Sequence, residues 1–146
     1  MKIKESKKII EQTICTFVAE DGKEFDSQYE CMKYEKEQEK KAVIEAAEKL
    51  SMSELDDKLP LSYDVNENNS FRWYKVENKE AFDTVNKAYA NSLQAPSHYP
   101  EIMCVETTGY EPYEDDAYSC TLTGLKATTE EFWQMMGFKV TLEPLK

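Results

Sequence analysis

The chain has 146 residues, of which 40% are hydrophobic and 12% aromatic, and this share of apolar side chains excludes a globally disordered protein. Its longest apolar runs are only a few residues, so the sequence predicts no membrane span, and we expect a cytoplasmic protein. The formal net charge of −11 disfavours direct binding to nucleic acid or anionic lipid and favours partners with a basic surface. Solubility alone is the alternative explanation of this charge.

A β-hairpin is predicted near the N-terminus. Residues 9–20 are rich in β-branched and aromatic side chains, and Asp21 and Gly22 then supply two residues that readily adopt positive φ. A two-residue type I′ turn at these positions predicts a register in which Val18 faces Phe25 across the hairpin.

A long helix is predicted over residues 28–50. Ser27 and Glu30 form the capping-box pattern S-x-x-E that often starts a helix. The middle of the helix, residues 35–41, is highly charged and has no apolar anchor, whereas its last turns are apolar. We therefore expect the helix to extend away from the hairpin, and its apolar end gives the chain a possible route to a homodimer.

The hairpin and the helix together have the spacing of a ββα zinc finger. Phe25 and Cys31 occupy the positions of its two core residues, and Tyr34 and Gln38 occupy the positions of its two histidine ligands. The stretch resembles a ββα zinc finger without its zinc, which implies a finger-like fold with no metal and no DNA-reading role. The pattern DG-x-x-F followed by E-C-x-x-Y-E also resembles small accessory proteins of phages and mobile elements of Gram-positive bacteria. An unrelated hairpin–helix unit with the same turn is the alternative interpretation.

A linker is predicted between two parts of the chain. Residues 51–69 contain Pro, Asp, Asn and Ser and show no clear hydrophobic period. The predicted organisation is therefore a hairpin–helix module at 1–52, a linker at 53–69 and a second domain at 70–146. Most of the negative charge belongs to the second part, because the residues after position 50 hold 8 basic and 17 acidic side chains.

The second domain is predicted to contain strands and helices in the order βαββαβ. The expected strands are 71–76, 101–106, 117–123 and 138–142, and the expected helices are 79–91, capped by Asn78, and a short one that begins at the capping box of Thr128 and Glu131. Gly137 is expected to end the last helix, with Phe138 packing back onto it. This order matches the ferredoxin-like plan, so the predicted fold class is α+β.

The sequence offers no strong candidate for catalysis, a metal or a cofactor. It has no phosphate-binding loop motif, and its single histidine, His98, lies in a Pro-flanked loop that predicts a surface residue. The cysteines, including Cys104 and Cys120 on predicted strands, are expected to be buried free thiols, with a Cys15–Cys31 disulfide as the alternative in an oxidising compartment. Core packing rather than a ligand pocket is the expected role of Trp73, Tyr74, Trp133, Met135 and Met136.

The acidic loop 106–116 is the predicted partner-binding site. It interleaves tyrosines with carboxylates, which suits a protein-binding surface because tyrosine provides contact area and carboxylates pair with Arg or Lys. A loop that is only solvated is the alternative. The candidate binding residues are Glu106, Tyr110, Glu111, Tyr113, Glu114, Asp115 and Asp116.

These features predict a non-enzymatic, acidic binding protein of phage or mobile-element origin. Such a protein would act stoichiometrically on a host protein with a basic surface, for example a nucleic-acid-binding or defence protein, as anti-CRISPR and other anti-defence inhibitors do. No catalytic residue, metal ligand or cofactor is assigned. The alternatives are an assembly protein that associates with itself through the 28–50 helix and a small ligand- or nucleotide-binding enzyme domain.

Overall fold

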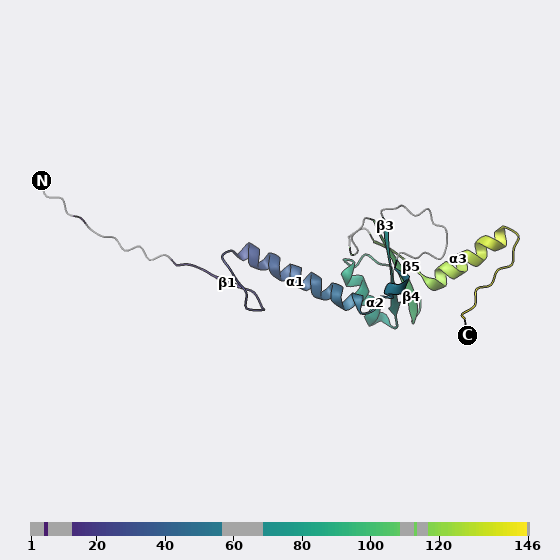
Figure 1. Ribbon diagram of the computed structural model, residues 1–146, viewed down its shortest axis with the longest axis horizontal. Helices are drawn as coiled ribbons and strands as arrows, with labels where there is room; N and C mark the ends of the chain where they lie inside the picture. Colours follow the sequence, from purple (N-terminus) through teal and green to yellow (C-terminus); the bar gives the residue numbers. More distant parts are fainter. Residues whose placement is uncertain (1–4, 6–12, 57–68, 109–112, 114–116, 146) are drawn as a thin grey trace. The chain divides into compact units, whose positions relative to one another are not determined.

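The computed structural model describes residues 5, 13–56, 69–108, 113 and 117–145, and it has the predicted α+β class (Figure 1). The chain divides into two compact units, residues 1–39 and 40–146. The boundary lies inside helix α1, Gln28–Glu48, and not in the predicted linker.

Residues that follow α1 belong to the second unit and do not form a free linker. The backbone N–H of Met52 donates to the carbonyl of Trp73 at 2.7 Å, and the N–H of Lys75 donates to the carbonyl of Leu50 at 3.0 Å. A short 3-10 helix, Ser53–Leu55, then packs against the neighbouring strand. Of the predicted linker, residues 57–68 lie outside the described part of the chain.

The N-terminal hairpin forms, but the predicted register is wrong by one residue. Strands β1, Phe17–Val18, and β2, Glu24–Phe25, pair so that Phe17 faces Phe25 and Val18 faces Glu24. Since neighbouring residues point to opposite faces of a strand, this shift turns Val18 outward, and its side chain is 57% exposed.

The turn chemistry explains the shifted register. The N–H of Gly22 donates to the carbonyl of Ala19, and the N–H of Ala19 donates to the carbonyl of Lys23, both at 2.9 Å. Gly22 has a φ of +88°, which glycine adopts without a steric penalty. The connection is therefore a three-residue loop that ends in a left-handed glycine, and the predicted two-residue type I′ turn is not formed.

Aromatic and hydrogen-bond contacts hold the hairpin against the start of α1. The hydroxyl of Tyr34 donates to a carboxylate oxygen of Asp21 at 2.7 Å, and its ring centroid lies 5.2 Å from that of Phe25. The ammonium of Lys23 lies 4.2 Å from the centre of the Tyr34 ring. The hydrogen bond from Tyr34 is the main cause of a lowered pKa at Asp21. Tyr34, at the position of a zinc-finger ligand, thus makes the contacts that join helix and hairpin.

The start of α1 follows from the sequence, and its last turns are packed in the second unit. The hydroxyl of Ser27 accepts from the N–H of Glu30 at 3.1 Å, which confirms the predicted N-cap. Near the other end, Ala47 is fully buried and Val43 and Ile44 pack against the core of the second unit.

The second unit is built on a three-stranded antiparallel sheet in the order β3-β4-β5. These strands are β3, Asn69–Val76, β4, Glu101–Thr108, and β5, Ala117–Thr121. Helix α2, Lys79–Ala88, begins at the predicted cap Asn78, whose side chain accepts from the N–H of Ala81 at 2.9 Å.

The ferredoxin-like topology is wrong for the described strands. In that plan, the two strands joined by the first helix are parallel and another strand separates them. Here α2 joins β3 and β4, which are direct antiparallel neighbours. The helix stops at Ala88, and Ala90 and Asn91 have φ values of 52° and 60°, so the chain changes direction there before it enters β4.

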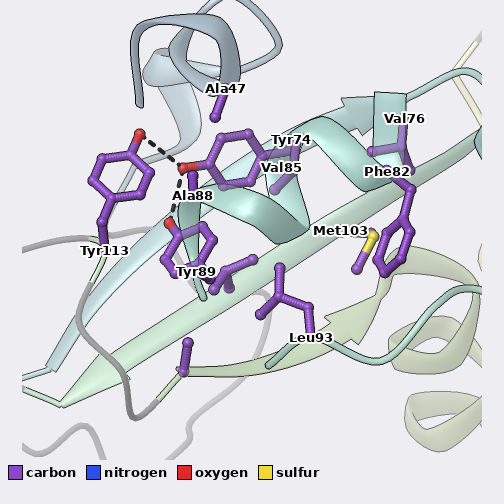
Figure 2. Close-up of a cluster of buried hydrophobic side chains, with 12 residues drawn as sticks. Ala47, Tyr74, Val76, Phe82, Val85, Ala88, Tyr89, Leu93, Met103 and Tyr113 are labelled. Carbon is purple, nitrogen blue, oxygen red and sulfur yellow. Dashed lines mark hydrogen bonds between the residues drawn. The ribbon is translucent and has the colours of Figure 1, made fainter. Parts of the chain in front are cut away.

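One face of the sheet carries the main core. Tyr74, Val85, Tyr89 and Met103 are fully buried, and they come from β3, α2, the end of α2 and β4 (Figure 2). The opposite face carries a smaller cluster, because alternate residues of a strand point to opposite sides. Its buried members are Phe71, Trp73 and Cys104, and Met52, Leu55, Ile102 and Leu125 pack against them.

Helix α3, Leu122–Met135, begins earlier than predicted. Its N-cap lies seven residues before the predicted cap, Thr128. Thr121 is the N-cap, because its hydroxyl accepts from the N–H of Gly124 at 3.0 Å. The hydroxyl of Thr128 instead donates to the carbonyl of Gly124 at 2.9 Å, within the helix. Thr121 is thus both the last residue of β5 and the N-cap of α3.

We expect Thr121→Ala to lower the free energy of unfolding by about 1 kcal/mol, since it leaves a helix N–H without its cap. Thr121→Ser keeps the hydroxyl and is the matched control, expected to stay close to the parent chain. Urea denaturation measures both. Equal losses for the two variants would contradict a capping role.

The end of α3 is as predicted, whereas the strand expected after it does not form. Gly137 has a φ of +88°, and the N–H of Phe138 donates to the carbonyl of Trp133 at 2.9 Å, which is a Schellman ending. Residues 138–145 have no regular structure. The N–H of Leu142 donates to the carboxylate of Glu130 at 2.8 Å, so the chain returns along the helix (Figure 1).

Candidate functional site

The predicted partner-binding residues divide into described and undescribed positions. Glu106 is half-buried, and it accepts a hydrogen bond from the side-chain amide of Asn69 at 2.5 Å. The prediction treats Tyr113 as a surface residue, but its side chain is 8% exposed and belongs to the main core. The other predicted residues, Tyr110, Glu111, Glu114, Asp115 and Asp116, lie outside the described part of the chain.

Tyr113 is one member of a buried tyrosine network. Its hydroxyl accepts from that of Tyr74 at 3.1 Å, and Tyr74 and Tyr89 share a hydrogen bond of 2.8 Å (Figure 2). The hydroxyl of Tyr113 also donates to the carboxylate of Glu48. Burial is the main cause of a raised pKa at all three tyrosines, and it raises the pKa of Tyr89 to about 12. The guanidinium of Arg72 lies 2.8 Å from the carboxylate of Asp56 and 3.9 Å from that of Glu48, so the two acids share it. The network satisfies polar groups inside the core, which is a structural role.

His98 lies half-exposed in its loop, as the sequence predicts, and it contacts a buried carboxylate. Its Nε2 lies 3.4 Å from Oε2 of Glu101, whose side chain is 4% exposed. The other oxygen of Glu101 accepts from the N–H of Ile102 at 2.9 Å. The contact between His98 and Glu101 joins the loop to the start of β4, so its role is structural.

A cavity of about 590 Å³ opens on the face of the sheet opposite the tyrosines. It lies between the sheet and α3, and the loop at 94–97 also lines it. Its lining includes the apolar residues Phe71 and Leu125 and the polar residues Glu106 and Thr128. Both cysteines of the sheet, Cys104 and Cys120, form part of its wall.

The two sheet cysteines stand directly opposite each other in the pairing of β4 with β5. Cys104 is buried, as predicted, but Cys120 is exposed, so the expectation of burial is wrong for it. Cys31 is buried and Cys15 is exposed, and all four thiols are free. The sequence placed both strands but not their register, because no tight turn connects them, and the cysteine pair was therefore not predicted.

The second half of α3 presents large apolar side chains to solvent, which contradicts the predicted core role of three of them. Trp133 is 38% exposed and Met135 82%, and Met136 is exposed as well, whereas Trp73 and Tyr74 are buried as predicted. Residues 130–142, which we call the α3 hook, hold most of this surface. Its exposed apolar members are Phe132, Trp133, Met135, Met136, Phe138 and Leu142.

The aromatic rings of the α3 hook pack against one another. The ring centroid of Trp133 lies 5.6 Å from that of Phe132 and 5.9 Å from that of Phe138, and both pairs are edge-to-face. The contact of Trp133 with Phe138 is the apolar contact that accompanies a Schellman ending. The hook is therefore a defined apolar surface held in place by hydrogen bonds and ring contacts.

Within the described residues, no group of three or more His, Cys, Asp and Glu side chains is arranged to hold a metal ion. None of the helices in that part of the chain combines the length and the apolar character that a membrane span needs. The fold and its exposed hook define an acidic α+β protein with a large apolar surface on its last helix. Comparison with known protein families, curated proteins and solved structures found no match to the chain.

Proposed function

We propose that this chain is a non-enzymatic binding protein that acts stoichiometrically on another protein through the α3 hook. The observation that carries the proposal is the exposure of six large apolar side chains on one helix end and the segment that returns along it. Large exposed apolar patches on soluble proteins commonly mark interaction sites. Aromatic residues and methionine are also enriched at protein interfaces.

The charge of the chain defines the chemistry of the partner. A net charge of −11 favours a protein that presents an apolar groove with Lys and Arg at its rim. Two acidic residues of the hook, Glu130 and Glu131, and Glu143 directly after it are neighbours in sequence of the apolar side chains. A host nucleic-acid-binding or defence protein with such a basic surface is the proposed target. This choice rests on the charge of the chain, and the proposed origin in a phage or mobile element rests on the sequence resemblance.

Self-association through the end of α1 finds less support than the hook. The apolar residues Val43, Ile44 and Ala47, which suggested that route, pack against the core of the second unit. They are therefore occupied within one chain and offer little area to a second copy. Exposed apolar residues of α1 do occur near its start, where Tyr29 and Met32 provide a matched control surface.

The test compares two double variants as affinity baits. Phe132→Gln/Met135→Gln removes an aromatic ring and a methionine from the hook, and Tyr29→Gln/Met32→Gln removes the same side-chain types from α1. Captured proteins from the organism that carries the gene are quantified by mass spectrometry and then purified for titration. We expect the hook variant to lose about 2 kcal/mol of binding, roughly 30-fold in Kd, and the α1 variant to bind as the parent does.

Three outcomes would contradict the proposal. The first is equal binding by both variants, which would contradict the role of the hook. The second is an affinity that does not fall when the salt concentration is raised to about 1 M, which would contradict the basic character of the partner. The third is a dimer of the chain alone, seen by light scattering, that the hook variant abolishes, because the occupant of the hook would then be a second copy. A 1:1 complex with a captured protein is the expected result.

A further inference from the structure

Cys104 and Cys120 form a cross-strand thiol pair. Residues directly opposite in an antiparallel pair point to the same face of the sheet, so both thiols face the cavity. Cys104 and Cys120 are paired across β4 and β5, and each is the first cause of the pKa shift of the other. The register of the sheet therefore places the two thiols side by side on one face.

The two thiols are not equivalent. Cys104 is 2% exposed, whereas Cys120 is open to solvent. The hydrogen bond from Cys104 lowers the pKa of Cys120, and that bond together with burial raises the pKa of Cys104. Because the thiolate is the reactive form of cysteine, the accessible thiol is also the more reactive one.

We propose that Cys104 and Cys120 are a redox-active dithiol that reacts with small-molecule disulfides entering the cavity, with Cys120 attacking and Cys104 resolving. The cavity of about 590 Å³ gives the disulfide room beside Cys120. Glu106 lies in the same wall, so a disulfide that carries a positive charge is the favoured substrate. The reaction is independent of the α3 hook and of any partner protein.

The reaction balances as two successive thiol–disulfide exchanges. The Cys120 thiolate attacks one sulfur of the disulfide R–S–S–R, the S–S bond breaks, and one RS⁻ leaves as Cys120 becomes the mixed disulfide. Cys104 then gives its proton to the released RS⁻, and its sulfur attacks the Cys120 sulfur, which releases the second RS⁻. This second RS⁻ takes from water the proton that Cys120 released when it ionised. The protein dithiol loses two electrons, and the disulfide gains them and becomes two thiols.

The backbone permits the resulting disulfide. Opposite Cα atoms in an antiparallel pair are about 4.5 or 5.5 Å apart, and both spacings lie within the roughly 4.4–6.8 Å that disulfides use. The bond would join β4 to the edge strand β5 beneath the start of α3.

The experiment uses the full chain with Cys15→Ser, because Cys15 is the other exposed thiol among the described residues. Each protein is treated with cystamine, which is cationic, or with the neutral bis(2-hydroxyethyl) disulfide, and intact mass and peptide mapping follow the products. We expect a Cys104–Cys120 disulfide without a retained adduct. Cys104→Ser, or Cys104→Ala if the serine variant misfolds, is expected to retain one mixed disulfide on Cys120.

Two further variants separate the roles of the residues. Cys120→Ser is expected to react at least about tenfold more slowly, since the remaining thiol is buried. Glu106→Gln is expected to reduce the preference for cystamine over the neutral disulfide by several-fold. A stable adduct on Cys120 without an internal disulfide, or unchanged reactivity in Cys120→Ser, would overturn the dithiol; an unchanged preference in Glu106→Gln would overturn the favoured charge.

Discussion

Tyr74→Ala is expected to lower the free energy of unfolding by about 3–5 kcal/mol, which is a large part of the stability of an ordinary domain. Tyr74 lies on the face of β3 that carries the main core, and it is fully buried. Its ring packs edge-to-face on that of Tyr89, with ring centroids 6.1 Å apart. The substitution leaves a cavity in the core and removes a hydroxyl that contacts two other buried hydroxyls. Urea denaturation followed by circular dichroism measures the loss.

Two phenylalanine variants separate the ring from its hydroxyl. Tyr74→Phe keeps the packing but removes the hydrogen bonds to Tyr89 and Tyr113, and we expect a loss of about 1–3 kcal/mol. Tyr118→Phe is the matched control, since Tyr118 is 67% exposed, and its effect should stay within about 0.5 kcal/mol. If the two phenylalanine variants were equally stable, the hydroxyl network would contribute nothing.

Alkaline pH is expected to destabilise the second unit before its buried tyrosines ionise. Burial raises the pKa of Tyr89 from 10.0 to about 12, and it also raises the pKa values of Tyr74 and Tyr113. A raised pKa means that a tyrosine loses its proton at a lower pH in the unfolded chain than in the folded chain. The protonated tyrosines therefore make their full contribution to the free energy of unfolding below pH 10, and this contribution is lost as pH rises from about 10 toward 12. The Tyr89 shift alone corresponds to roughly 3 kcal/mol.

The measurement is the free energy of unfolding as a function of pH, together with the ultraviolet absorbance of tyrosinate. Exposed tyrosines such as Tyr29 and Tyr118 should ionise in the folded chain, whereas the buried three should ionise with unfolding. Tyr89→Phe is the control, because it removes one raised pKa and should flatten the decline above pH 10. Gradual ionisation of every tyrosine without unfolding would contradict the expectation.

Local signals in the sequence were sufficient for most element ends. Ser27 and Asn78 cap their helices as predicted, and Gly137 with Phe138 ends α3 as predicted. These features depend on side-chain and backbone groups within a few residues of one another. Their energies are therefore decided before any long-range contact forms.

Competition between local signals was harder to resolve. The capping box of Thr128 and Glu131 is a valid start signal, but Thr121 starts the helix earlier and Thr128 then lies inside it. In the hairpin, Asp21 and Gly22 suit a two-residue turn, but the longer loop buries Ala19 and leaves Val18 exposed. In both places two locally acceptable conformations competed, and the backbone hydrogen bonds of the Gly22 turn and the Thr121 cap belong to the one that formed.

The candidate sites depended on contacts that sequence patterns do not contain. Cys104 and Cys120 are 16 positions apart, and they meet because β4 and β5 pair in one register. The hook residues Trp133 and Met135 were expected in the core, since helical spacing does not show whether another element covers a helix face.

By itself, the sequence determined the α+β class, the hairpin followed by a long helix, and most helix ends, because these depend on local propensity and hydrophobic period. Only the tertiary structure decided the antiparallel neighbours β3 and β4, the burial of Tyr113, the exposure of the α3 hook and the opposed cysteines. Each of these depends on which distant segments cover one another, and the free energy of that choice comes from burial and pairing over the whole unit.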